Sequence, residues 1–404
     1  MSRSEQSLEP LYRGQAPEDP GTLAAVTVGL GSLADFIDEK YLREYIPMGG
    51  SKIKFVTGRP GSGKTHLCRW LLDRAREEGY RTASFSAREV WLHDFRGVYL
   101  EILRQVDLEA VLRDCADRII SDLGYDPGAV PAGGRFMDLL AEKGEGDALA
   151  KGEIRGALRS FFTRNPMLDS GFAACCALLT GDILGHPVLE PASRALLYDY
   201  LHGVQGVKLS QVRALGLSPT GITRYNARHL LRSLTETVHL SGRPGLLVWI
   251  DDMETLLTRA ADAPIRYTRL RREDTYESIR QLIDDIDSMR YCLFLLSFDR
   301  SLMDDENLGM KSYQALWMRI QNEVVSTRLN RFADIIDMDR YADECYPPQV
   351  LVQMSGRLRE TLGLSRPPLT EPEAEEIVAR GQYGGLGLPY LVNRAMLEGG
   401  SQND

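Results

Sequence analysis

A glycine-rich turn followed by lysine and threonine is the part of this sequence that most directly indicates chemistry. Residues 55–70 read FVTGRPGSGKTHLCRW, in which Gly58 is followed after four residues by Gly63, Lys64 and Thr65. Glycines let backbone N–H groups point at phosphate oxygens, lysine brings a positive charge to the β- and γ-phosphates, and a threonine hydroxyl can bind Mg²⁺. The spacing predicts a phosphate-binding loop (Walker A) for ATP with Mg²⁺. Its predicted residues are Gly58, Arg59, Pro60, Gly61, Ser62, Gly63, Lys64, Thr65 and His66.

The segments on either side of this turn match the setting that such a loop requires. Residues 52–57, KIKFVT, are typical of a buried strand, and residues 65–80 have the apolar spacing of an amphipathic helix that ends near Gly79. A helix that begins near Lys64 would direct the positive end of its dipole at the bound phosphates. A strand, a loop and a helix in this order favour nucleotide binding over a glycine-rich turn that binds nothing.

A second acidic motif follows a later apolar run. Residues 245–250, GLLVWI, are typical of a central parallel strand that is covered on both faces, and Asp251 and Asp252 follow directly. A carboxylate at the carboxyl end of such a strand, beside a phosphate loop, is where Mg²⁺ is held. We therefore predict that Thr65 and Asp251 bind Mg²⁺ (Walker B) and that Asp252 or Glu254 orients the attacking water.

Four residues further along the chain are candidates for contacts with the nucleotide. Ser297 ends another apolar run, where a polar residue in ATPases of the AAA+ type can orient water. Arg328 and Arg331 precede the last predicted strand, where an AAA+ subunit offers an arginine to its neighbour's γ-phosphate. Arg394 could contact phosphate from the last predicted helix, and an ordinary surface position is the alternative explanation for each of the three arginines.

The rest of the sequence predicts an α/β fold built around a parallel sheet. Helical patterns with few strands fill residues 90–240 and predict a large helical insertion, and three helical stretches after Tyr341 predict a small helical lid. The expected organisation is a flexible N-terminal tail at 1–21, an AAA+-type core at 22–340 that is interrupted by the insertion, and a C-terminal helical lid at 341–404.

Composition narrows the class of protein. The 404 residues carry a net charge of −9, with 43% apolar and 26% charged residues, which is ordinary for a soluble globular protein and argues against a surface coated for nucleic-acid binding. Six cysteines include no CxxC pair and no zinc-type spacing, and no apolar run approaches the length of a membrane span. We expect a cytoplasmic protein with reduced thiols that does not enter a membrane.

A family resemblance appears in the loop segment GRPGSGKTHLCRWLLDRAREEGYRTASFS together with the stretch from Tyr200 to Leu257, which ends in LLVWIDDMETLL. These segments resemble the BREX phage-defence ATP-binding proteins of the BrxD type, which are themselves similar to the Orc/Cdc6 branch of AAA+ ATPases. The likeness in order and spacing runs from about Leu30 to the C-terminus. It implies an ATPase of antiviral defence that works beside other proteins, with DNA as a candidate partner.

Two positions depart from the family pattern. Relatives typically place glutamate where this chain has Asp252, and aspartate is shorter by one methylene, about 1.5 Å. A misplacement of that size can lower a rate by roughly a hundredfold. Tyr390 stands where an arginine would be expected in the lid. ATP binding is thus better supported than turnover.

Two functions of different classes remain open. The first is a DNA-linked ATPase in a homo-oligomer, since Arg266, Arg269, Arg271 and Arg272 surround Tyr267, and arginines with a ring can bind a phosphate backbone and stack on a base. Pairing with Glu273 and Asp274 is the alternative explanation for these arginines. The second function is a nucleotide-gated scaffold that recruits partner proteins with little turnover. A small-molecule kinase fits less well, because the long insertion suits partner binding.

Overall fold

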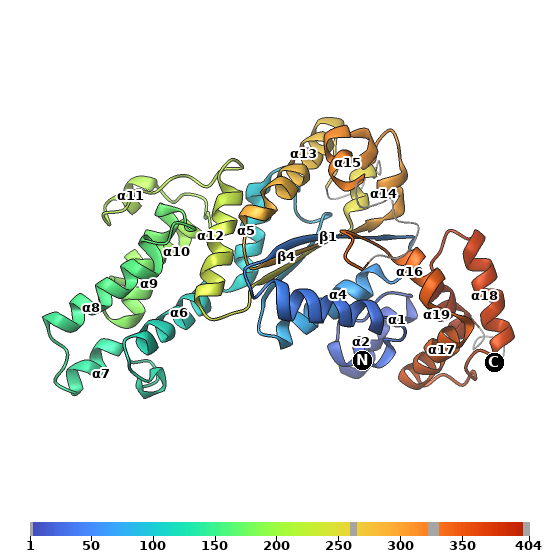
Figure 1. The fold of residues 1–404 in the computed structure, drawn as a ribbon, viewed down its shortest axis with the longest axis horizontal. Helices are drawn as coiled ribbons and strands as arrows, with labels where there is room; N and C mark the ends of the chain where they lie inside the picture. Colours follow the sequence, from blue (N-terminus) through green and yellow to red (C-terminus); the bar gives the residue numbers. More distant parts are fainter. Residues whose placement is uncertain (1–2, 259–264, 322–330, 399–404) are drawn as a thin grey trace.

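The computed structural model describes residues 3–258, 265–321 and 331–398, and its centre is a five-stranded sheet (Figure 1). The strand order is β2-β3-β4-β1-β5, and every pairing is parallel. This arrangement confirms the predicted α/β class. The strands are β1 (Ser51–Gly58), β2 (Arg81–Ser86), β3 (Leu246–Asp251), β4 (Cys292–Asp299) and β5 (Ile335–Asp337).

Both faces of the sheet are covered, because apolar side chains alternate between two cores. Phe55 and Phe294 point into a core shared with the helices that follow β2, and Val56 and Leu295 point into a second core on the opposite face. Continuous apolar strands of this kind belong in the centre of a parallel sheet, where neither face meets water. The carboxyl ends of β1, β3 and β4 therefore meet at one edge.

The second core contains the helix that follows the glycine-rich loop. Helix α4 (Lys64–Glu77) buries Leu67, Cys68 and Leu71 against the sheet. Helices α2 (Pro20–Val26) and α3 (Gly31–Ile37) lie beside it, and the same core extends into a C-terminal group of helices. This group, here called the C-terminal helices, consists of α16 (Met338–Cys345), α17 (Pro348–Leu362), α18 (Glu371–Tyr383) and α19 (Leu388–Glu398).

The chain between β2 and β3 is helical and extends away from the sheet. Its helices are α5 (Phe95–Val106), α6 (Leu108–Asp122), α7 (Phe136–Glu142), α8 (Ala148–Leu158), α9 (Ser170–Leu184), α10 (Pro191–Leu201), α11 (Leu209–Arg213) and α12 (Ala227–Leu240). Figure 1 shows α6 to α11 at the opposite end of the molecule from the C-terminal helices, while α5 lies beside the sheet. Three further helices follow β3 and β4, namely α13 (Arg269–Asp285), α14 (Arg300–Asp304) and α15 (Gln314–Gln321).

The N-terminal segment differs from the expected flexible tail. Residues Arg3–Tyr12 form helix α1, and the following loop packs against the C-terminal helices. The side-chain amide of Asn393 donates a hydrogen bond of 3.0 Å to the carbonyl of Leu11. Apolar positions at Leu8 and Leu11 explain the difference, because they complete the second core from a segment whose composition is otherwise polar. Within the described residues, no helix has both the length and the apolar character that a membrane crossing requires.

Candidate nucleotide-binding site

The glycine-rich loop leaves β1 at Gly58 and enters helix α4 at Lys64, as its sequence predicts. Gly61 and Gly63 have φ angles of 76° and 96°, in the left-handed region that favours glycine. At Gly61 space is a second reason, since a Cβ atom there would lie 2.3 Å from the Cβ of Tyr390. The loop is therefore shaped both by its own backbone and by the start of α19.

The ammonium group of Lys64 lies under the loop and is almost fully buried. Its Nζ donates to the carbonyls of Gly58 at 2.9 Å and Arg59 at 3.0 Å, and to Asp299 Oδ1 at 2.7 Å. Asp299 ends β4 and pairs with Gly58 in the register of the sheet. The charge that would meet phosphate is thus held at the sheet edge by a carboxylate.

Asp251 and Thr65 lie together at the end of β3 and the start of α4. The Thr65 hydroxyl donates to Asp251 Oδ2 at 3.2 Å, and burial raises the pKa of the Asp251 carboxyl. A hydroxyl and a carboxylate beside a phosphate loop are oxygen ligands of the kind that Mg²⁺ takes together with phosphate oxygens and water. These two residues fit the metal role predicted for them.

Ser297 lies beneath Asp251 rather than at the surface of the site. Its side chain is fully buried, and its hydroxyl donates to Asp251 Oδ1 at 2.5 Å while accepting a hydrogen bond of 2.7 Å from the indole N–H of Trp249. A residue in this position orients the Asp251 carboxylate. The predicted contact of Ser297 with an attacking water does not match this placement, because the hydroxyl does not reach the surface of the site.

The two candidates for orienting water point in different directions. Asp252 has a φ of 57° and turns toward β2, where it accepts hydrogen bonds from the Ser86 hydroxyl at 2.7 Å and pairs with Arg88 at 3.2 Å. Glu254 reaches β4, where its Oε2 accepts the backbone N–H of Asp299 at 3.2 Å, while its Oε1 pairs with the same Arg88 at 3.4 Å. Burial, and then the charge of Asp299, raise the pKa of Glu254.

Three residues of this constellation are not among the sequence predictions. Asp299 could have been found, since it lies two residues after Ser297 on the same face of a strand that ends there. Ser86 and Arg88 follow β2 and carry no motif, so only the pairing of β2 with β3 brings them to Asp252.

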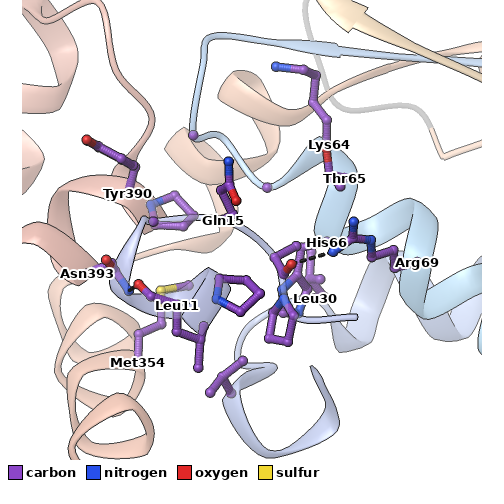
Figure 2. A pocket seen from close by; sticks show the side chains of 18 of the residues that line it. Leu11, Gln15, Leu30, Lys64, Thr65, His66, Arg69, Met354, Tyr390 and Asn393 are labelled. Atoms are coloured by element: carbon purple, nitrogen blue, oxygen red, sulfur yellow. Dashed lines mark hydrogen bonds between the residues drawn. The ribbon is translucent and has the colours of Figure 1, made fainter. Parts of the chain in front are cut away.

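A cavity of about 480 Å³ continues from Lys64 and Thr65 away from the sheet. Figure 2 shows Tyr390 and Asn393 of α19 on one side of it, His66 and Arg69 of α4 on the other, and Gln15 of the N-terminal segment between them. Leu11, Leu30 and Met354 form its apolar floor. Apolar walls with a few polar groups, next to a phosphate loop, are what a nucleoside requires.

Comparison with known proteins decides the family. Residues 1–122 and 187–341, well over half of the chain, match the family described as BREX system ATP-binding protein BrxC/D. The chain belongs to this BREX family. Membership gives it a place in a phage-defence system and ATP as its ligand, in agreement with the loop and the cavity. No curated protein and no solved structure matches the chain significantly.

The BREX family match includes every element that carries the loop and its carboxylates, but it ends before α17. The loop nevertheless depends on the C-terminal helices beyond that point. The side chain of Arg59, a predicted nucleotide-binding residue, donates to the carbonyls of Gly381 at 2.5 Å and Gly384 at 2.7 Å, both beyond the matched residues, and to Asp339 at 3.0 Å. Its side chain therefore fastens the loop to the C-terminal helices of this BREX protein.

Two of the three predicted arginines outside the loop lie in the part of the chain that the structure describes, and neither lines the cavity. Arg394 is more than half exposed and pairs with Glu398 one turn away, so it lies on α19 without lining the cavity. Arg331 is exposed, and Arg328 lies outside the described residues. The structure thus gives Arg394 a helix-surface contact in place of the predicted phosphate contact.

The predicted nucleic-acid surface at 266–272 has its arginines together, but its aromatic ring is buried. Arg266, Arg269, Arg271 and Arg272 line one hollow, but the ring of Tyr267 is 4% exposed, and its hydroxyl accepts the backbone N–H of Leu92 at 3.0 Å. The ring of Tyr267 packs against the ring of Trp91. This contact and the burial of the Tyr267 ring stabilise the fold, which an exposed ring would not do. Stacking of a base on Tyr267 is therefore excluded in this conformation.

Proposed function

We propose that this BREX protein is an ATPase of the AAA+ type, in which the C-terminal helices act as a lid over the nucleotide. The observation that carries the proposal is the meeting of the loop, Lys64, Thr65 and Asp251 at one edge of a sheet with the order β2-β3-β4-β1-β5. The close contact of α19 with the loop supports the lid, because the N–H of Tyr390 bonds to the carbonyl of Gly61 at 3.2 Å.

The chemistry follows from the placement of the side chains. Lys64 would neutralise the β- and γ-phosphates, Thr65 and Asp251 would hold Mg²⁺, and the bound ion would polarise the terminal phosphate. Glu254 fits the role of water-orienting base better than Asp252, because it contacts the backbone of Asp299, whose carboxylate bonds to Lys64, whereas Asp252 is held by the Ser86 hydroxyl at the end of β2. Arg88 contacts both carboxylates. Arg331 is exposed on the surface and could act on the nucleotide of a neighbouring copy in an oligomer.

DNA is one of the two partners that we propose for this ATPase. The four arginines at 266–272 gather in one hollow, which suits a phosphate backbone. Neighbouring acids reduce the charge of this hollow, because Arg269 pairs with Glu273 at 2.9 Å. A protein of the same defence system, held by the helices between β2 and β3, is the other partner.

A second candidate function is a nucleotide-gated scaffold with little turnover. The observation that favours it is the engagement of Asp252 with Ser86 and Arg88, which occupies both of its carboxylate oxygens. In this alternative, ATP binding changes the contact between α19 and the loop, and the change recruits a partner protein without DNA.

Phosphate release from ATP by the purified protein, with and without duplex DNA, distinguishes the two functions. Lys64→Ala is the control, because it removes the charge that the phosphates require. Release that DNA stimulates, and that Lys64→Ala abolishes, supports the DNA-linked ATPase. Tight ATP binding without release in either condition supports the scaffold. Equal ATP affinity of Lys64→Ala and the wild type would refute the site itself.

A further inference from the structure

The ammonium of Lys64 has no donor left for a phosphate in this conformation. An ammonium group has three N–H donors. Two of them point at the carbonyls of Gly58 and Arg59, and the third points at Asp299. A phosphate oxygen that approaches Lys64 must therefore displace one of these acceptors, and Asp299 is the one that carries a negative charge.

Asp299 lies at the start of the loop, beside the ammonium group that the phosphates would approach. It ends β4 next to Gly58, at the sheet edge where the loop begins, and about a quarter of its side chain is exposed. Its backbone N–H is fixed by Glu254 at 3.2 Å, so the strand end cannot swing away without breaking that bond. With the backbone held in this way, the carboxylate would stay close to Lys64 when a nucleotide binds.

We propose that Asp299 is an anionic gate that determines how strongly the site distinguishes a nucleoside triphosphate from a diphosphate. This inference rests on the nucleotide site proposed above. The β-phosphate of a diphosphate can replace a carbonyl at Lys64 while Asp299 keeps its own bond. The γ-phosphate of a triphosphate adds negative charge next to the carboxylate, and the two like charges repel each other at short range. Mg²⁺ between the phosphates lowers this repulsion.

The proposed gate and a purely structural role of Asp299 predict different effects on the ratio of triphosphate to diphosphate affinity. Asp299→Asn keeps the size of the side chain and removes its charge, so affinity for the triphosphate should rise by about tenfold relative to the diphosphate. The shift should be larger without Mg²⁺ than with it. If Asp299 only stabilised the loop, both affinities would change by the same factor.

Calorimetric titration with ADP and with a non-hydrolysable ATP analogue, with and without Mg²⁺, measures this ratio. Asp304→Asn is the matched control, because Asp304 is half exposed at the end of α14, where it pairs with Arg300. Asp299→Ser is a second variant without charge, in case Asp299→Asn does not fold. A triphosphate preference that rises in either Asp299 variant but not in Asp304→Asn supports the gate.

Two other outcomes would overturn the gate, and they can be told apart. If the wild type binds both nucleotides and the ratio stays the same in the folded Asp299 variants, the gate is wrong and the nucleotide site stands. If the wild type binds neither nucleotide, the proposed site is wrong and the gate falls with it.

Discussion

Trp249 donates its indole N–H to the hydroxyl of Ser297 across 2.7 Å, and this contact is buried between β3 and β4. Because the Ser297 hydroxyl is engaged by Trp249, its own hydrogen is directed at Asp251, 2.5 Å away. The orientation of the carboxylate that would hold Mg²⁺ is thus determined from below, by two residues that never meet the nucleotide.

Removal of the Ser297 hydroxyl should destabilise the protein and weaken Mg²⁺ binding together. Ser297→Ala leaves a buried indole N–H and a carboxylate oxygen without their partner, which should lower the free energy of unfolding by about 1–3 kcal/mol. Urea unfolding and the Mg²⁺ dependence of ATP affinity measure the two effects. Ser121→Ala is the control, because that exposed hydroxyl only bonds to the carbonyl of Asp117, and it should change the free energy by less than about 0.5 kcal/mol. Equal losses in both variants would contradict this account.

Glu254 should matter more for turnover than Asp252. Removal of a base that orients water typically lowers a rate by about 10²–10⁴-fold, and we expect Glu254→Gln to fall in this range. Asp252→Asn should lower the rate by less than about tenfold, since the Ser86 hydroxyl holds the Asp252 carboxylate at the end of β2. Single-turnover phosphate release at saturating ATP measures both variants. The opposite ranking would return the role of base to Asp252.

Gly387 should be intolerant of a side chain because the loop passes directly over it. A Cβ atom there would lie 2.4 Å from the Cα of Ser62, so Gly387→Ala must separate α19 from the loop. We expect a loss of about 1–3 kcal/mol in the free energy of unfolding and weaker ATP binding. Gly385→Ala is the matched control, since a Cβ atom at Gly385 meets no atom within 4 Å. A Gly387→Ala variant with wild-type ATP affinity would show that the C-terminal helices do not contribute to ATP binding.

His66 should make the fold sensitive to acid. Desolvation, and then the charge of Arg69, lower the pKa of His66 to about 4, from an ordinary value of 6.5. The unfolded chain then binds a proton that the folded chain does not bind, so the free energy of unfolding falls as the pH drops from about 6.5 to about 4. One such proton contributes about 1.4 kcal/mol per pH unit inside that window and nothing above it.

Chemical unfolding at several pH values between 7 and 4, with His66→Gln as the comparison, tests this prediction. The variant should lose less stability per pH unit than the wild type, because glutamine does not titrate. The bond between Thr27 Oγ1 and His66 Nε2, at 2.8 Å, can be kept by a glutamine amide. Parallel curves for the two proteins would show that His66 does not hold the low pKa.

If the protein binds DNA, the arginines at 266–272 should carry the salt dependence and Tyr267 should not. Replacement of Arg266 and Arg269 by alanine should reduce the slope of log affinity against log salt by about two, since each phosphate contact contributes about one. Arg104→Ala with Arg113→Ala is the control, because both arginines are exposed on helices of the insertion. Tyr267→Phe should leave the DNA affinity unchanged. An equal slope in the test and control pairs would remove this hollow from the DNA-binding hypothesis.

Sequence alone predicted what short-range patterns determine. The strand at 51–58, the loop and the helix from Lys64 follow from local spacing, and the family assignment follows from the same motifs. The contact between Lys64 and Asp299 spans 235 positions and depends on strand order, which no local pattern contains. For Tyr267, the local pattern was misleading. Its arginine neighbours suggested an exposed ring, but the ring packs against Trp91. The polar composition of the N-terminal segment likewise gave no indication that Leu11 packs in the second core.

The contact between α19 and the loop has a consequence for the order of events during synthesis. The loop is made early, but Gly387 and Tyr390, which close one side of it, are joined to the chain more than 300 positions later. At the usual pace of bacterial translation, that interval is on the order of tens of seconds. A growing chain therefore contains the complete motif long before it has a complete pocket. Any nucleotide that meets the emerging loop finds only part of its binding surface, and full affinity should arise only after α19 has been synthesised and has packed against the loop.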